Sequence, residues 1–294
     1  MSSPAALPPA DPVALQRTVR RLHGAGRVPW LHEEAARRMA DRLPLVKLQP
    51  DVVLDWSGPL GASQALLRQA YPRARHQTVG VPQPPVPPRR WPWSRPAAPA
   101  LQVLADDAVP AGQAQLLWAN MMLHGMPDPQ PVFERWRQAL AVGGFLMFST
   151  LGPGTLPELR AIYREQGWGP ALAPPIDMHD LGDQLVQAGF ADPVMDQELL
   201  TLTWADADAL LRELRTLGAN VSRDRHPGLR TPRWLAQLKQ ALSVHALQGR
   251  PALTIELVYG HAFCPEPRAR MQPQTTVSVD DMRRMVRTPR ARGS

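Results

Sequence analysis

The sequence predicts an α/β fold in which helices cover both faces of a mainly parallel β-sheet. Short apolar runs with the length of strands alternate along the chain with segments of helical periodicity. Most of these runs are continuously apolar, which is typical of strands buried on both faces. Parallel neighbours need a crossover connection, so we expect the intervening helices to lie on the two faces of the sheet.

The first elements follow a segment rich in Pro, Ala and Ser, residues 1–12, which we expect to be a disordered tail. Helical spacing begins near Val13. Apolar residues at helical spacing over 31–43 predict an amphipathic helix that ends before Pro44. The run 52–55 and the turn and helix that follow predict a strand, loop and helix unit. The elements expected up to the middle of the chain are strands at 52–55, 76–81, 101–104, 115–119 and 144–150 and helices at 62–70 and 132–141.

Capping residues mark the later helices. Thr155 and Glu158 match a capping box for a helix over 156–166. Asp177 is placed to cap the next helix, and Gly189 to end it. The remaining expected elements are helices at 178–188, 206–217 and 233–247 and strands at 199–204 and 252–261.

Composition adds two segments outside this pattern. Eight of the 34 prolines fall between Pro82 and Pro99, which predicts a loop insertion at 82–100. Residues 268–294 hold seven arginines and two aspartates, so this part carries +5 of the total +7. We expect one domain over 13–265 and a basic, disordered C-terminal tail over 266–294.

The single cysteine, Cys264, excludes an internal disulfide and a thiolate metal cluster, and it favours a reducing compartment, by default the cytoplasm. Neither a secretory signal nor a membrane-spanning run is expected. His32-Glu-Glu34 lacks a second histidine one turn further on, so no metal site is predicted there.

Six segments carry a resemblance to a known family. They are residues 46–55, 117–120, 145–160, 177–183, 188–196 and 255–263. The blocks Asp177-Met-His-Asp-Leu-Gly182 and Val258-Tyr-Gly-His-Ala262 are its most specific parts. Together the segments resemble the malonyl-acyl carrier protein O-methyltransferases of biotin synthesis, the BioC family. The resemblance covers about residues 13–265 and implies a Rossmann-like class I methyltransferase fold with a seven-stranded sheet.

The resemblance also implies S-adenosyl-L-methionine as cofactor and a malonyl group on an acyl carrier protein as substrate. The expected cofactor residues lie after the first four strands: Asp55, Ser57, Gly58, Gly61, Gln83, Asp106 and Asn120. Two glycines of the family's loop are replaced here, by Ser57 and Pro59. Gln83 stands where the family has the ribose-binding carboxylate.

Methyl transfer to a carboxylate needs no general base, because the nucleophile is already ionised, but it does need a cation to hold that nucleophile. We expect Arg160 to be this cation, since a guanidinium fork matches a carboxylate. The altered cofactor loop leaves a second function open, that of a catalytically inactive binding or regulatory protein. A nucleic-acid partner recruited by the arginine-rich tail is a third and weaker alternative.

Overall fold

The computed structural model describes residues 10–24, 28–56, 58–80, 103–124, 126, 128–244 and 246–266. Gln83, Ser57, the insertion 82–100 and the tail beyond Glu266 therefore lie outside the described residues. The α-helices are α1 (Pro12–Gly24), α2 (Trp30–Ala40), α3 (Gln64–Ala70), α4 (Gln130–Ala139), α5 (Pro157–Glu165), α6 (Met178–Gln187), α7 (Ala207–Leu217) and α8 (Pro232–Val244). Short 3₁₀ turns lie at η1 (Leu43–Leu45), η2 (Gly58–Gly61) and η3 (Asp106–Ala108).

The strands are β1 (Val52–Asp55), β2 (Arg75–Val79), β3 (Val103–Leu104), β4 (Ala114–Asn120), β5 (Leu140–Leu151), β6 (Ala191–Thr203), β7 (Ala246–Leu247) and β8 (Arg250–Phe263). Their order is β3-β2-β1-β4-β5-β8-β6, and the two-residue β7 pairs with the beginning of β8. The first five strands on this path are mutually parallel, whereas β8 runs antiparallel to both β5 and β6. The expected mostly parallel sheet is confirmed, with β7 as an addition to the seven expected strands.

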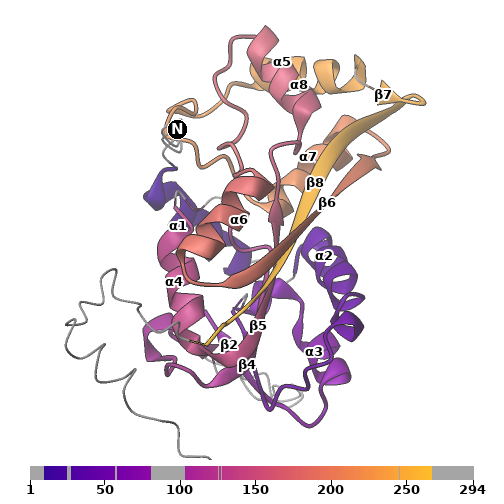
Figure 1. Ribbon diagram of the computed structural model, residues 1–294. Helices are drawn as coiled ribbons and strands as arrows, with labels where there is room; N and C mark the ends of the chain where they lie inside the picture. Colours follow the sequence, from indigo (N-terminus) through magenta and orange to yellow (C-terminus); the bar gives the residue numbers. More distant parts are fainter. Residues whose placement is uncertain are drawn as a thin grey trace, which may run out of the picture.

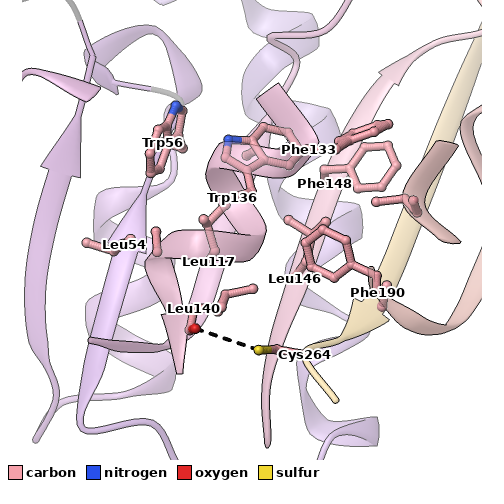
Figure 2. Close-up of a cluster of buried hydrophobic side chains, with 14 of the residues drawn as sticks. Leu54, Trp56, Leu117, Phe133, Trp136, Leu140, Leu146, Phe148, Phe190 and Cys264 are labelled. Carbon is pink, nitrogen blue, oxygen red and sulfur yellow. Dashed lines mark hydrogen bonds between the residues drawn. The ribbon is translucent and has the colours of Figure 1, made fainter. Parts of the chain in front are cut away.

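The two faces of the sheet are covered by different helices (Figure 1). Val53 contributes to a core with α2 and α3, while its neighbour Leu54 contributes to a core with α4 and α6. This alternation follows from the two-residue repeat of a strand, and because both neighbours are fully buried it explains the continuous apolar runs. Figure 2 shows the second core, in which Phe133, Trp136 and Phe148 pack with ring centroids 5.5 to 6.1 Å apart.

A third, smaller cluster lies among α5, α7 and α8 and the beginning of β8, with Leu210, Leu242 and Leu253 at its centre. Tyr163 and Trp168 meet edge to face over it, with ring centroids 5.5 Å apart. These helices form a cap at one end of the sheet (Figure 1).

Most expected elements are confirmed within a few residues, and three expectations need correction. The helix expected over 233–247 ends at Val244, and Ala246–Leu247 is a strand instead. The strand expected over 199–204 begins at Ala191. Ordered structure begins before Val13, because Ala10 forms an antiparallel bridge with Ser222.

The predicted capping box at Thr155 and Glu158 is wrong. Leu156 is the residue before α5, and no side chain caps that helix. The Glu158 carboxylate accepts hydrogen bonds from the backbone N–H and the hydroxyl of Thr254 on β8, at 3.0 and 2.6 Å. A partner 96 residues away thus takes the carboxylate that the local pattern assigned to the helix end. By contrast, the Asp177 cap is confirmed, since its carboxylate accepts from the backbone N–H of His179 at 2.8 Å.

Candidate active site

The order of the strands places a crevice where β1 and β4 lie side by side. Successive strands run from β1 outward through β2 to β3 on one side, and from β4 to β5 on the other. In open α/β sheets ligands bind outside the carboxyl ends of the strands at such a switch point. The expected site residues Asp55 and Asn120 end β1 and β4, and Asp106 follows β3, so the fold brings all three to this edge.

The turn after β1 runs close to the end of β2. Asp55 is only 4% exposed at the end of its strand. Gly58 has φ +62°, a left-handed conformation that favours glycine. A Cβ atom on Gly80 would lie 3.5 Å from the Cα of Gly58, so the two backbones pass each other closely. The bulky Trp56 does not enter the crevice, because its side chain packs in the core on the α4 side (Figure 2).

Asn120 holds this turn in place. Its side-chain amide donates to the backbone carbonyls of His32, at 2.8 Å, and Gly61, at 2.7 Å. Its carbonyl oxygen accepts from the hydroxyl of Ser149 on β5 at 2.5 Å. Asn120 is 1% exposed, so these contacts join the ends of β4 and β5 to the loop and to α2. The carboxamide expected to contact a ligand is thus engaged as a structural clamp.

Two histidines that the sequence did not single out as a pair meet at the same edge. His32, 4% exposed, donates from Nδ1 to the carbonyl of Leu60 at 2.9 Å. With Nδ1 protonated in the neutral ring, Nε2 is an acceptor, and no group of the described residues bonds to it. The ring of His124 lies edge-on to that of His32, with centroids 6.0 Å apart.

Burial keeps both rings neutral. It lowers the pKa of His32 despite the opposing bond to Leu60. It also lowers the pKa of His124 to about 3, with a smaller contribution from His32. At neutral pH the pair therefore offers acceptors and neutral N–H donors rather than positive charge.

Of the other expected site residues, Asp106 follows β3 and Arg160 lies on α5. Asp106 is exposed after β3, and Arg135 on α4 fixes its backbone by donating to its carbonyl oxygen at 3.0 Å. Arg160 lies on α5, as expected, and its Nη2 donates to the carbonyl of Pro153 at 2.5 Å. A guanidinium has five N–H donors, and this bond uses one of them.

The loop that joins β5 to α5 wraps around Glu256 of β8, which is 6% exposed. The backbone N–H of Gly154 donates to its carboxylate, and the Thr155 hydroxyl bonds to its backbone. A Cβ on Gly152 would lie 2.5 Å from the Glu256 side chain, so a larger residue there would have to displace that carboxylate. No local pattern in the sequence marks this carboxylate, because its partners lie about 100 residues away.

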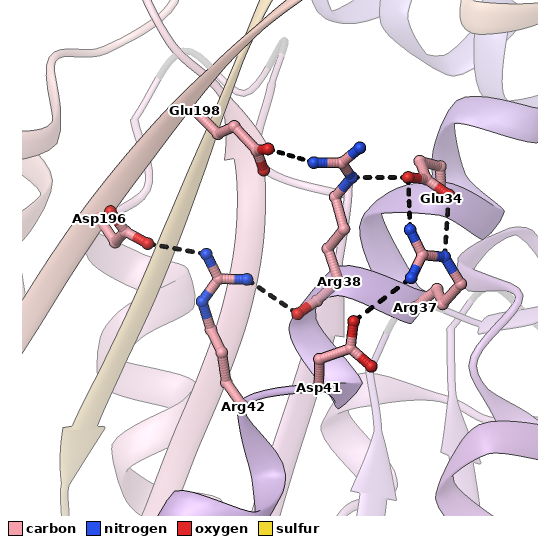
Figure 3. A network of polar contacts seen from close by, with 7 residues as sticks. All are labelled: Glu34, Arg37, Arg38, Asp41, Arg42, Asp196 and Glu198. Atoms are coloured by element: carbon pink, nitrogen blue, oxygen red, sulfur yellow. Dashed lines mark hydrogen bonds and ion pairs between the residues drawn. The ribbon is translucent and has the colours of Figure 1, made fainter.

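Ion pairs fix α2 over the edge of the sheet (Figure 3). Arg38 bonds Glu34 on its own helix and reaches Glu198 on β6. Arg42, just beyond the helix, bonds Asp196 on β6 at 2.7 Å and lies 4.1 Å above the ring of Tyr259. These contacts position the helix that carries His32 over the crevice.

The crevice fits S-adenosylmethionine in three respects. It has a glycine turn whose backbone an approaching ligand could contact, at Gly58, and a carboxylate at the end of β1. Beside them stands the buried acceptor Nε2 of His32, which has no partner in the described part of the chain. In the part of the chain that the structure describes, no group of three or more His, Cys, Asp or Glu side chains could hold a metal ion. No helix in the described ranges is both long and apolar enough to cross a membrane.

Comparison with known proteins gives the family. No protein-family model matches the chain. A malonyl-[acyl-carrier protein] O-methyltransferase of Gallionella capsiferriformans is 37% identical over 248 residues, covering 81% of this chain and 85% of the relative. Its counterpart in Laribacter hongkongensis is 35% identical over 257 residues, covering 83% and 86%.

Among solved structures, the YcgJ protein of Bacillus subtilis covers 80% of this chain and 100% of its own, with a TM-score of 0.50 and 9% identity. This likeness concerns the fold alone and agrees with the strand order. The sequence relatives go further: at these identities and coverages, the chain belongs to the family of malonyl-[acyl-carrier protein] O-methyltransferases.

Proposed function

We propose that this protein transfers a methyl group from S-adenosylmethionine to the free carboxylate of a malonyl group carried by an acyl carrier protein. The observation that carries the proposal is the match to the named methyltransferases over more than 80% of both chains. The crevice at the β1–β4 switch point supplies a place for the reaction.

When bound, S-adenosylmethionine supplies a methyl group on a positively charged sulfur. Asp55, Gly58 and Asp106 would hold this cofactor, since they stand at the ends of β1 and β3. His32 would contribute its free Nε2 acceptor. A substrate carboxylate attacks as the anion, so the chain needs to orient it and exclude water rather than remove a proton.

Arg160 would hold the substrate carboxylate. It lies on α5 directly after the loop that Glu256 shapes, and its bond to Pro153 orients the side chain. An Arg160→Gln variant should lose about 10- to 100-fold in kcat/KM, the value of a hydrogen bond to a charged group. Arg164, an exposed residue one turn further along α5, is the matched control. An equal effect in Arg164→Gln would contradict the role of Arg160.

Calorimetry with S-adenosylmethionine and its demethylated product tests the cofactor part. Micromolar binding is expected. Absence of binding heat at millimolar ligand would contradict the proposed enzyme. It would favour the alternative function of an inactive binding protein, which the replacements Ser57 and Pro59 in the cofactor loop left open. Rescue of a biotin-requiring strain that lacks its own methyltransferase tests the pathway, and failure by a folded, expressed protein would contradict a role in biotin synthesis.

A further inference from the structure

Two segments that lie about 190 residues apart in the sequence contact each other and bring positive charge together in the folded domain. Residues 10–24 and 212–233 contain nine arginines and three carboxylates, a net charge of +6. Residues 1–267 as a whole carry only +2, because the rest of the domain is net acidic. The arginines, called the basic face below, are Arg17, Arg20, Arg21, Arg212, Arg215, Arg223, Arg225, Arg230 and Arg233.

Direct contacts join the two segments. The guanidinium of Arg21 on α1 donates to the carbonyls of Gly218, at 2.5 Å, and Arg215, at 3.3 Å, at the end of α7. Asp11, before α1, forms an ion pair with Arg225 at 2.7 Å, and its backbone N–H bonds to Val221. The charges therefore gather in the folded domain although the sequence separates them.

Most of this charge is available to a partner. Seven of the nine arginines are exposed and form no ion pair with any described residue: Arg17, Arg20, Arg21, Arg212, Arg215, Arg223 and Arg233. Arg230 is held in place, with its guanidinium 4.9 Å above the ring of Trp234 and bonded to the carbonyl of Trp168. Next to it, Leu229 is 97% exposed and offers an apolar contact. The nearby carboxylates Glu213 and Asp224 only partly offset the arginines.

The basic face borders the crevice. Helix α1, which carries three of the arginines, contacts the Gly58–Gly61 turn. We propose that the basic face is the docking surface for an acidic carrier protein, which delivers its thioester-bound acyl group into the crevice. This inference rests on the proposed function. The inference adds the place where the carrier protein binds, on α1 and on the segment from α7 to α8.

The position of the face favours a carrier protein over a nucleic acid. A substrate that is covalently attached to its carrier requires the carrier to dock beside the reacting groups. Complementary charge at such a contact raises the association rate and fixes orientation, and salt screens it. A nucleic acid would use the same arginines but would have no need of the adjacent crevice.

The test compares two charge reversals of equal size. The first is the triple variant Arg20→Glu, Arg215→Glu and Arg223→Glu, on the basic face. The control is Arg68→Glu, Arg73→Glu and Arg75→Glu, three exposed arginines on and near α3 and β2. Each protein is assayed with malonyl-acyl carrier protein and with malonyl-N-acetylcysteamine, a small thioester without a carrier. Thermal unfolding midpoints establish that both variants are folded.

The first variant should lose about tenfold or more in kcat/KM for the carrier-bound substrate, equivalent to about 1.4 kcal/mol. It should keep the wild-type rate with the small thioester, and the control should keep both. Equal rates for wild type and the first variant on the carrier-bound substrate would overturn the docking surface while leaving the enzyme intact. Absence of methyl transfer to either substrate by the wild-type protein would instead refute the proposed function.

Fluorescence polarisation with labelled holo-carrier protein and with a labelled duplex DNA gives an independent readout. We expect salt-sensitive binding of the carrier protein that the first variant loses and the control keeps. Tight DNA binding through the basic face, with no carrier binding, would overturn the inference in favour of a nucleic-acid partner.

Discussion

Asn120→Ala removes the side chain that holds the crevice together, and its effect can be worked out from the structure. The hydrogen bonds lost include those from the amide to the carbonyls of His32 and Gly61 and the one from the Ser149 hydroxyl to the amide oxygen. A buried hydrogen bond contributes about 1 kcal/mol net, and a lost partner costs more where a polar group stays unsatisfied.

The loss of stability is smaller at Gly61, because its carbonyl still accepts a hydrogen bond from the Ser63 hydroxyl at 2.8 Å. We therefore expect Asn120→Ala to lower the free energy of unfolding by about 2–4 kcal/mol. Urea unfolding followed by tryptophan fluorescence measures this. Asn220→Ala is the matched control, since that partly buried amide donates to the Pro170 carbonyl at 2.7 Å and accepts from the backbone N–H of Ser222 at 3.0 Å, and its loss should cost about 1–2 kcal/mol.

The same variant separates stability from site geometry. Loss of the clamp frees the Gly61 turn and the beginning of α2, so affinity for S-adenosylhomocysteine should fall in Asn120→Ala and stay unchanged in Asn220→Ala. A loss of stability below about 1 kcal/mol for Asn120→Ala would refute the clamp. So would equal effects of the two substitutions.

Three further predictions concern the rest of the domain. Glu198→Gln should cost up to about 1 kcal/mol and abolish part of the salt dependence of unfolding, because its ion pair with Arg38 is only partly buried; an unchanged salt dependence would count against the network. The lowered pKa of His124, about 3, means that the unfolded chain binds the extra proton between about pH 6.5 and 3, so stability should decrease as pH falls through this window. His124→Gln should make that decrease shallower in acid unfolding curves, and an unchanged slope would contradict the buried neutral ring. Cys264 is fully buried and burial raises its pKa, so a thiol reagent should label it only at the rate of unfolding; rapid labelling of the native protein would contradict its position.

Local patterns were sufficient for much of the fold. The run that ends at Asp55 predicted a buried strand because Val52, Val53 and Leu54 are continuously apolar, as in a strand covered on both faces. Asp177 and Gly189 bounded α6 because the chemistry of a helix end depends on residues within one turn of it.

Long-range partners account for what the sequence did not show. Glu158 matches a capping box, but Thr254 on β8 offers it two donors and takes its carboxylate. Asn120 was placed correctly at the end of its strand, yet its clamp depends on carbonyls 59 and 88 residues away. His32 and His124 become a pair only once α2 is laid over the sheet.

The charge of a surface also depends on contacts between segments that are far apart in the sequence. The balance of +2 over residues 1–267 says little about a basic surface on the folded domain. The contact between Arg21 of α1 and Gly218 at the end of α7 joins two segments that are far apart in the sequence, and their positive charges together form the basic face. Net charge along a chain therefore says little about a surface until the contacts between segments are known.

The measurement that tests the central claim most directly is mass spectrometry of malonyl-acyl carrier protein after incubation with this protein and S-adenosylmethionine. We predict that the carrier-bound malonyl group gains the mass of a single methyl group, as an ester that base hydrolyses, with release of an equal amount of S-adenosylhomocysteine. An unmodified malonyl group, in the presence of folded protein and a fully loaded carrier, would contradict the assignment of this crevice as a methyl-transfer site.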